Sequence, residues 1–436
     1  MIVFFSIAWF LIFVKLLLFW LWLWQLKEYH LGRFKAHFEA QQIKKIISSF
    51  WRLKFPKFTK KMAVIFVACL TAEALLLLYF SFAWAVVFTV FLTPLLILFF
   101  QIPTVFWRRL IINKAKAKRL KSENLLVIGV TGSYGKTTTK EFLSFILGEK
   151  FNVLKTKEHQ NSEIGVSRCI LNDLNPEHQI FVCEMAAYNK GGIRLLADIA
   201  QPKIGVVTGV NEQHLATFGT MENLLSAEGG KELIDSLPKD GAAFFNGNNE
   251  YCRELYEKSK VKKFLYGKEA DFPGKENILG AAEVAKFLGM TQEEIKRAVE
   301  KIGSKFPGVD IKKGVNGLTV VDATYSSNPA AVISHLEYLK NFKEKKVIIM
   351  PCLIELGSAS KRIHGEIGQK ISEVCDLAII TTKDRFKEIK EVVGKKAIFM
   401  ESSREIFKKI GDFCSRGGVV LLEGRVPVQL IKLILP

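Results

Sequence analysis

The sequence predicts a membrane-anchored α/β protein: three N-terminal transmembrane helices, then a P-loop domain with a parallel sheet, and a smaller Rossmann-like C-terminal domain. Three observations lead to this fold class. Two long apolar runs near the N-terminus are flanked by basic segments. From about Asn124, short apolar strands alternate with helical segments, which is typical of a parallel sheet covered by helices. A glycine-rich loop follows the first of these strands.

The first apolar run, Met1–Trp24, carries one charge, Lys15, and is long enough to cross a hydrocarbon core of about 30 Å. It lacks the basic start and small-residue cleavage site of a signal peptide, so we expect it to be retained. The second run, Met62–Trp107, is too long for one span and has Glu73 as its only charge. We therefore expect a helical hairpin there, and spans at about 1–24, 62–81 and 84–105.

Basic residues are concentrated beside these runs. Of the net charge of +19, most comes from 26–61, with ten lysines and arginines against two acids, and from 108–121, with seven against none. The positive-inside rule places both segments in the cytoplasm, which predicts a multi-pass protein of the cytoplasmic membrane with its catalytic domains in the cytoplasm. The partners expected from this pattern include membrane lipid and exclude nucleic acid.

Several alternatives remain for this region. The apolar runs also fit buried core helices of a soluble protein. The segment 26–61 fits either an amphipathic helix on anionic lipid or a solvated basic linker. Glu73 is either a functional intramembrane acid or a packing detail. Seven scattered cysteines without a CxxC pair argue against a zinc site or a disulfide framework and fit a reducing compartment.

The rest of the chain divides into two series of strands. After a basic linker at 108–123, a first domain at 124–303 contains "LLVIGV", "QIFVCEMAA", "KIGVVTGV" and "GAAFFNG". A second domain at 304–436 contains "GLTVVDATY", "KKVIIMP", "DLAIITT", "KKAIFME" and "GGVVLLEG". Both series predict α/β sheets.

The glycine-rich loop, TGSYGKTT, predicts nucleotide binding. Its glycines let backbone N–H groups point at phosphate oxygens, and the following helix adds its dipole. We expect Lys136 to reach the β- and γ-phosphates of ATP and the Thr137 hydroxyl to bind Mg²⁺. Strict P-loop spacing would put a glycine at Val130, whereas this chain has Gly129. The expected nucleotide-binding residues of the loop are Thr131, Gly132, Ser133, Tyr134, Gly135, Lys136, Thr137 and Thr138.

Further motifs follow in order along the chain. They are "TKEHQNSEIGVS" with Asn161 and Ser162, "CEMAAYNKGGI" with Glu184, "TGVNEQHLATFGTMENLLSAEGGKEL" with His214, "GKENILGAAEVAKFLG" with Asn277, "VVDATYSSNPAAV" with Asp322, Tyr325 and Asn328, and "IELGSASKRIHGEIG". Together with the loop, this series resembles the Mur ligase family, and most closely its D-alanyl-D-alanine-adding (MurF-type) branch. The resemblance covers about 124–436.

The resemblance implies an ATP-dependent ligase that joins a carboxylate to an amine through an acyl phosphate. It assigns Mg²⁺ to Thr137, Glu184, His214 and Glu228, nucleotide contacts to Asn277 and Asp322, and substrate contacts to Asn161, Ser162, Tyr325 and Asn328. The catalytic set that it implies is Lys136, Glu184, His214 and Glu228. The expected substrates are a cell-wall precursor and an amino acid or dipeptide.

This chain departs from the family at three places. The family's carbamylated lysine falls on Glu228, whose carboxylate can serve as a similar oxygen ligand; Lys231 is the alternative. The family's ATP-contacting arginine aligns with Val309, and Lys305, Lys312 or Lys313 are candidates for its charge. Residues 1–123 stand where the family's peptidoglycan enzymes have a UDP-binding domain, which motivates the hypothesis of a lipid-linked precursor.

Two other functions remain open from the sequence. One is a ligase of the same fold with a different substrate, such as a folylpolyglutamate-type enzyme. The other is a non-catalytic, membrane-bound nucleotide sensor or scaffold, which the missing arginine and lysine motivate. ATP consumption that depends on both an amine and a carboxylate distinguishes an enzyme from a sensor.

Overall fold

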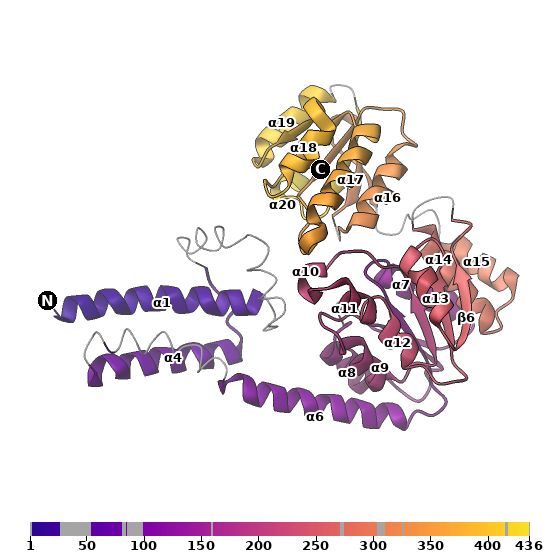
Figure 1. The fold of residues 1–436 in the computed structure, drawn as a ribbon, viewed down its shortest axis with the longest axis horizontal. Coiled ribbons are helices and arrows are strands. Elements are labelled where there is room, and N and C mark those ends of the chain that lie inside the picture. Colours follow the sequence, from indigo (N-terminus) through magenta and orange to yellow (C-terminus); the bar gives the residue numbers. More distant parts are fainter. Residues whose placement is uncertain are drawn as a thin grey trace. The chain divides into compact units, whose positions relative to one another are not determined.

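The computed structural model contains two compact units, Met1–Lys114 and Ala115–Pro436 (Figure 1). The structure describes residues 2–26, 54–80, 84, 99–157, 160–270, 274–302, 310–324, 327–414 and 417–435.

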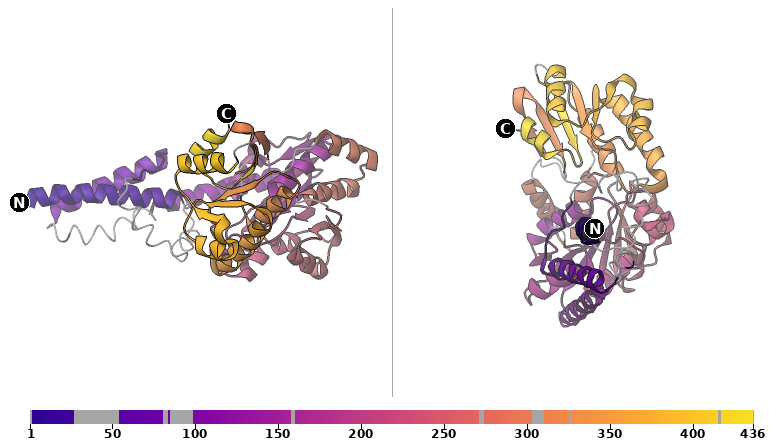
Figure 2. Two further views of the ribbon diagram at one scale, coloured as in Figure 1. Left: turned by 90° about the horizontal axis from the view of Figure 1, so that it is seen from above. Right: turned by 90° about the vertical axis from the view of Figure 1, so that its left-hand side faces the viewer.

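In the first unit, helices α1 (Ile2–Leu26) and α4 (Lys60–Tyr79) lie side by side (Figure 1, Figure 2). They are antiparallel, because Trp9 near the start of α1 donates a hydrogen bond of 2.7 Å to Glu73 near the end of α4. Glu73 is buried, so this bond gives the acid a packing role between the helices. The apolar seam is formed by Phe13, Leu17, Leu21, Met62, Ile65 and Cys69.

Among the described residues, two helices have the length and apolarity of a membrane span, at Ile7–Gln25 and Met62–Tyr79. Most of the predicted third span, 84–105, and most of the segment 26–61 lie outside the described residues. From residue 101 the chain forms α6 (Gln101–Leu120), which contains most of the predicted basic linker. The prediction of three transmembrane helices is therefore not confirmed.

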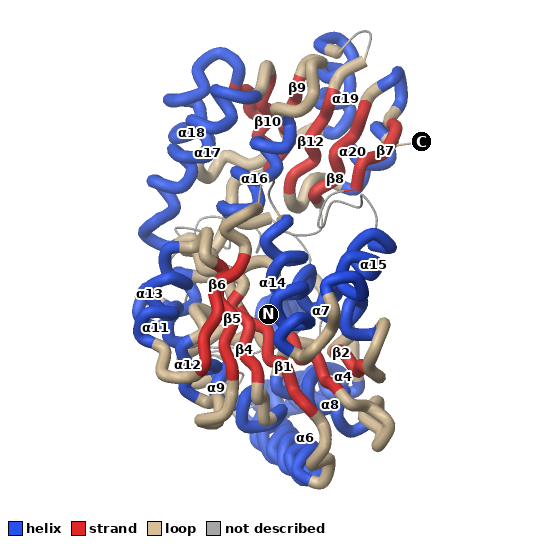
Figure 3. The backbone as a smooth tube through the Cα atoms, turned by 90° about the vertical axis from the view of Figure 1, so that its right-hand side faces the viewer, coloured by secondary structure: helices blue, strands red, loops and turns tan. Residues whose placement is uncertain are grey.

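The first sheet has six parallel strands in the order β2-β3-β1-β4-β5-β6 (Figure 3). One face is covered by α7, α14 and α15, which share a buried apolar cluster with the strands. On the other face, α12 packs so closely that a Cβ atom on Gly129 would lie 2.9 Å from Leu233. The strands are β1 (Leu126–Thr131), β2 (Val153–Lys155), β3 (Ile180–Glu184), β4 (Ile204–Val207), β5 (Ala242–Asn246) and β6 (Lys262–Tyr266).

The strands of this domain are connected and followed by helices α7 to α15. They are α7 (Lys136–Gly148), α8 (Glu163–Asn172), α9 (Gly192–Ala200), α10 (Leu215–Phe218), α11 (Met221–Ser226), α12 (Lys231–Asp235), α13 (Glu250–Lys258), α14 (Lys275–Phe287) and α15 (Gln292–Ile302).

The second sheet has the order β11-β10-β9-β12-β8-β7, and only its edge strand β7 is antiparallel (Figure 3). Helices α16 (Pro329–Leu339), α17 (Ser360–Val374) and α18 (Phe386–Val393) cover one face, and α19 (Ser403–Phe413) and α20 (Val428–Ile434) cover the other. The strands are β7 (Asp310–Lys313), β8 (Thr319–Ala323), β9 (Lys346–Met350), β10 (Leu377–Ile380), β11 (Ala397–Phe399) and β12 (Val419–Glu423).

The predicted parallel-sheet domain and the second α/β domain are thus confirmed. All nine strands expected from the sequence are present. The structure adds β2, β6 and β7, all of which are edge strands.

Arg119, near the end of α6, fastens that helix to the first sheet domain. Its side chain is 8% exposed and donates hydrogen bonds of 2.9–3.0 Å to the carbonyl oxygens of Ala200, Ser122 and Leu125. We predict that Arg119→Met lowers the free energy of unfolding of this domain by about 2–4 kcal/mol, because buried carbonyl groups lose a charged donor. Pulse proteolysis of the full chain in urea measures the change.

The matched control is Lys121→Met, which makes the same substitution at an exposed cation two residues later. We expect this control to stay within about 0.5 kcal/mol of the unsubstituted chain. Equal losses in the two variants would contradict the anchoring role of Arg119.

Candidate functional site

The loop between β1 and α7 has a shape that only glycine allows at two positions. Gly132 and Gly135 have φ of 143° and 75°. A Cβ atom on Gly132 would lie 2.2 Å from Thr208 Oγ1, and one on Gly135 would lie 2.7 Å from Asn277 Oδ1. Because α7 has no side-chain N-cap bond, its first N–H groups remain suited to an anion. The loop thus has the geometry of a phosphate cradle.

Ser133 and Tyr134 hold the loop in this shape through contacts with Gly209. The Ser133 N–H donates to Gly209 O at 2.7 Å. The Tyr134 ring packs against Gly209, and burial raises the pKa of its phenol far above the usual range. Thr131 Oγ1 is buried and has no hydrogen-bond partner among the described residues. The side chain of Tyr134 therefore serves packing, while the backbone forms the cradle.

Glu184 lies beside the loop because β3 pairs with β1 in a register that puts Glu184 opposite Val130. Its Oε1 accepts hydrogen bonds from Thr137 Oγ1 and Asn161 Nδ2, both at 3.1 Å. Its Oε2 lies 3.3 Å from the ammonium group of Lys140. The structure therefore brings together three residues that the sequence singled out and adds Lys140, which it did not.

His214 and Glu228 form a second cluster. His214 Nδ1 lies 3.1 Å from Glu228 Oε2, and His214 Nε2 lies 3.6 Å from Glu355 Oε2. Burial alone would raise the pKa of Glu228, but the charges of His214 and Lys136, with hydrogen bonds from His214 and Ser133, lower it below its usual value. Glu228 is consequently a buried carboxylate that stays ionised at neutral pH.

Lys136 connects the two clusters. Its ammonium group contacts Gly132 O, lies 3.4 Å from Ser133 O and lies 4.0 Å from Glu228 Oε1. The neighbouring residue, Thr137, holds Glu184. The predicted catalytic residues therefore converge on the phosphate loop.

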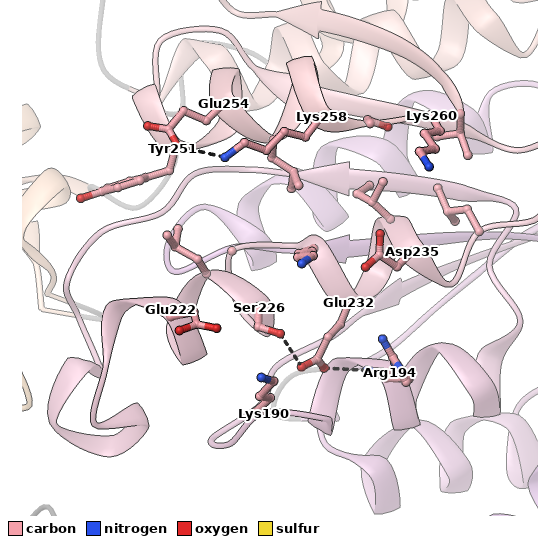
Figure 4. Close-up of a pocket in the computed structure, with 18 of the residues that line it drawn as sticks. Lys190, Arg194, Glu222, Ser226, Glu232, Asp235, Tyr251, Glu254, Lys258 and Lys260 are labelled. Carbon is pink, nitrogen blue, oxygen red and sulfur yellow. Dashed lines mark hydrogen bonds and ion pairs between the residues drawn. The ribbon is translucent and has the colours of Figure 1, made fainter.

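The structure separates the two candidates for the carbamylated-lysine position. Glu228 faces His214 and Lys136, whereas Lys231 is exposed and lines a different pocket of about 940 Å³ (Figure 4). None of the other predicted site residues lines that pocket. Its buried acid, Glu232, accepts hydrogen bonds from the backbone N–H groups of Gly191 and Arg194, so it is engaged in holding α9.

The nucleotide-binding candidates outside the loop lie in different domains. Asn277 on α14 is buried under the loop and accepts a hydrogen bond from Thr139 at 3.0 Å. Asp322, at the end of β8, forms an ion pair of 2.6 Å with Lys312. Burial would raise the pKa of Asp322, but hydrogen bonds from Lys312 and Thr324 lower it. Lys312 is thus already paired, while Lys305 and Val309 lie outside the described residues.

Of the predicted substrate-binding residues, one joins the Glu184 cluster and two cap helices. Asn161 joins the Glu184 cluster, whereas Ser162 caps α8 by accepting a hydrogen bond from the Gly165 N–H. Asn328 caps α16 and also accepts a hydrogen bond of 3.1 Å from Asn211. Tyr325 lies outside the described residues.

Segment 211–216, which carries His214, receives several contacts from the second sheet domain. Arg362 forms an ion pair with Glu212, and Ala216 N–H donates to Glu355 O at 3.0 Å.

Sequence reasoning did not assign roles to Lys140, Thr208 or Arg362. For Lys140 a signal existed, because a charged residue four positions after Lys136 falls on the helix face that carries the apolar residues.

The oxygen donors of Thr137, Glu184 and Glu228 fit Mg²⁺, which prefers oxygen ligands and usually combines one or two carboxylates with substrate phosphates, whereas His214 would add a nitrogen donor. Among the described residues, no group of three or more His, Cys, Asp or Glu side chains converges as a cation site. Thr137 with Glu184, and His214 with Glu228, are therefore partial ligand sets that phosphate oxygens would complete.

Comparison with known proteins identifies both sheet domains. Residues 130–309 match the Mur ligase middle domain, and residues 309–426 match the glutamate ligase domain of Mur ligases. UDP-N-acetylmuramoyl-tripeptide–D-alanyl-D-alanine ligases from Synechocystis and Bacillus subtilis are 30% and 27% identical over 56% of this chain. The chain spans 59% and 60% of the length of these relatives.

Solved structures show the same fold. MurF from Thermotoga maritima in complex with ADP has a TM-score of 0.64 and 27% identity, with 75% of this chain and 82% of that chain covered. MurF from Acinetobacter baumannii has a TM-score of 0.66 and 22% identity, with coverage of 73% and 77%.

These findings correct one prediction and establish the family. The localisation predicted from the sequence, a multi-pass protein of the cytoplasmic membrane, is wrong: two apolar helices among the described residues are weak evidence for membrane spans, and the matched relatives are UDP-N-acetylmuramoyl-tripeptide–D-alanyl-D-alanine ligases. Buried core helices and signal sequences have the same length and composition. The two domain matches together span 130–426, so the chain belongs to the Mur ligase family.

Proposed function

We propose that this protein is an ATP-dependent ligase that joins an amino acid or dipeptide to the carboxylate of a cell-wall precursor. The observation that supports this most directly is the convergence of Lys136, Glu184 and the His214–Glu228 pair on one phosphate loop. The names of the matched relatives, which are ligases for a UDP-linked muramoyl tripeptide, support the substrate class.

The loop and its lysine would hold the triphosphate of ATP. The backbone N–H groups at the start of α7 would face the phosphates, and Lys136 would neutralise part of the phosphate charge. Mg²⁺, when bound by Thr137 and Glu184 and by His214 and Glu228, would neutralise further charge on the phosphates. Phosphoryl transfer depends mainly on such charge neutralisation and alignment.

The reaction would proceed in two steps. The substrate carboxylate attacks the γ-phosphorus of ATP, which breaks the bond to the β-phosphate oxygen and yields an acyl phosphate and ADP. The amine then attacks the acyl carbon, so that an amide forms, phosphate leaves and the amine proton passes to phosphate or water. The second sheet domain would bring the amine to this site and exclude water.

The proposed forms of the carboxylate substrate take account of residues that the family match does not include. Residues 1–129 lie outside the matched domains, and the curated relatives are longer than the matched part. We propose either a UDP-linked or a lipid-linked muramyl peptide as the acceptor, because both present the same peptide carboxylate.

The test is to incubate the full chain with ATP, Mg²⁺ and D-alanyl-D-alanine, and with either UDP-linked or undecaprenyl-linked muramyl peptides. Product mass and ADP release are measured together. Turnover of the UDP-linked form alone would reject the lipid-linked version. ADP release that requires neither carboxylate nor amine would reject the ligase and favour the nucleotide sensor.

We predict that the activity does not depend on dissolved CO₂, because Glu228 supplies a permanent carboxylate beside Lys136. Assays in degassed buffer and in bicarbonate should give equal rates. Glu228→Gln should lower kcat by about a hundredfold, because the site loses a buried negative charge. Glu228→Lys should be similarly inactive without CO₂ and should regain activity with bicarbonate, as carbamylation restores the charge.

The control for this series is Lys231→Gln, which alters the other sequence candidate. We expect its rate to remain within twofold of the unsubstituted protein. Bicarbonate stimulation of the unsubstituted protein, or a large loss in Lys231→Gln with little in Glu228→Gln, would contradict the assignment of Glu228.

We further predict that Glu355→Gln weakens catalysis. Removing this charge alters the contact between Glu355 and His214 Nε2, and His214 belongs to the proposed cation site. A partly exposed contact of this kind is worth about 1 kcal/mol at most, so kcat/KM should fall by no more than about fivefold. Glu373→Gln, on the exposed surface of the same domain, is the control. Equal effects in both variants would contradict the prediction.

A further inference from the structure

Lys140 is a charged residue inside the core of the first sheet domain. It lies one turn after Lys136 on α7, and its exposed fraction is 0%. Removing an ammonium group from water is expensive, and lysine is almost never fully buried unless it is paired. A buried lysine at this place therefore requires a specific partner.

The partner is the carboxylate of Glu184. Lys140 Nζ lies 3.3 Å from Glu184 Oε2 and 3.1 Å from Glu141 Oε1. By geometric criteria Lys140 Nζ has no hydrogen-bond partner among the described residues, so Lys140 acts on both carboxylates mainly through its charge. Glu141 is 44% exposed and also pairs with Lys155, whereas the Glu184 side chain is 6% exposed. The inner carboxylate thus depends on Lys140 more than the outer one does.

The two oxygens of Glu184 are used differently. Oε1 faces Thr137 and Asn161, which belong to the phosphate-loop side of the site. Oε2 faces Lys140 in the core. The ammonium group attracts Oε2 while Thr137 and Asn161 hold Oε1, so these contacts together set the rotation of the carboxylate.

We propose that Lys140 is a positioning residue for divalent-cation binding: it holds the Glu184 carboxylate so that Oε1 and Thr137 Oγ1 face the same cation beside the phosphates. The inference rests on the proposed function for the identity of the ligand, Mg²⁺ with a nucleotide. Groups that orient a ligating side chain are typically worth about ten- to hundredfold in metal affinity.

The experiment measures nucleotide binding rather than turnover. Fluorescence of N-methylanthraniloyl-ADP is titrated with the full chain at a series of free Mg²⁺ concentrations. Mg²⁺ is expected to increase the affinity for the nucleotide. In Lys140→Met, the Mg²⁺ concentration that gives half of this increase should rise about ten- to hundredfold. Affinity without Mg²⁺ should stay within threefold, because Lys140 lies behind Glu184 and not on the phosphates.

Two further variants separate positioning from packing. Lys140→Arg keeps the charge and should retain most of the Mg²⁺ response. Glu141→Gln removes the outer partner only and should leave the response within twofold. Thermal unfolding of each variant confirms that the domain is folded.

The other outcomes contradict either the positioning role of Lys140 or the proposed cation site. A folded Lys140→Met with an unchanged Mg²⁺ response rejects the positioning role. Loss of folding in Lys140→Met and Lys140→Gln, with Lys140→Arg intact, assigns the charge to stability of the core and also rejects it. If the unsubstituted protein binds the nucleotide without any Mg²⁺ response, the proposed cation site fails instead, whatever Lys140 does.

Discussion

The parallel pairing of β1 with β3 is the constraint on which the candidate site depends. It sets Val130 opposite Glu184, so that the last residue of β3 lies beside the first residues of the phosphate loop. The carboxyl ends of neighbouring parallel strands share one edge, and side chains from distant parts of the chain meet there without long loops. A slip of one residue in this register would turn Glu184 to the opposite face of the sheet and separate it from Thr137.

Charges of alternating sign surround this edge. Lys140 faces Glu184 on one side of the loop, and Lys136 faces Glu228, which in turn faces His214, on the other. A buried charge is tolerated only when its partners remain in place, so the groups constrain one another. An unmodified lysine at 228 would set a second ammonium group next to Lys136. A glutamate there keeps the alternation without any chemical modification of the chain.

Sequence reasoning predicted the parts of the fold that have strong local patterns. Buried strands such as β4 and β12 are continuous apolar runs, and the loop has a glycine-rich signature, so both could be recognised. The strands that were missed are short or polar. β7 reads DIKK and β2 has three residues, because strands at the edge of a sheet bury little. The basic segment after residue 108 was interpreted as a linker, although charges at helical spacing also suit the exposed side of α6.

Within the site, the sequence could place residues on strand ends and loops but could not show which side chains touch. Glu228 and Lys231 lie three positions apart, and only the turn between α11 and α12 directs one to His214 and the other to solvent. The contact of His214 with Glu355 was equally invisible, since it joins segments about 140 positions apart. Both residues have φ of 68°, and they are two of the four non-glycine residues with positive φ among those the structure describes. Such conformations are strained and persist only when neighbours hold them. Here the Ala216 N–H bond to Glu355 O ties the two backbones together, so the strained turn at His214 and the strained turn at Glu355 stabilise each other. The orientation of the imidazole is consequently a property of both sheet domains, not of the loop that carries it.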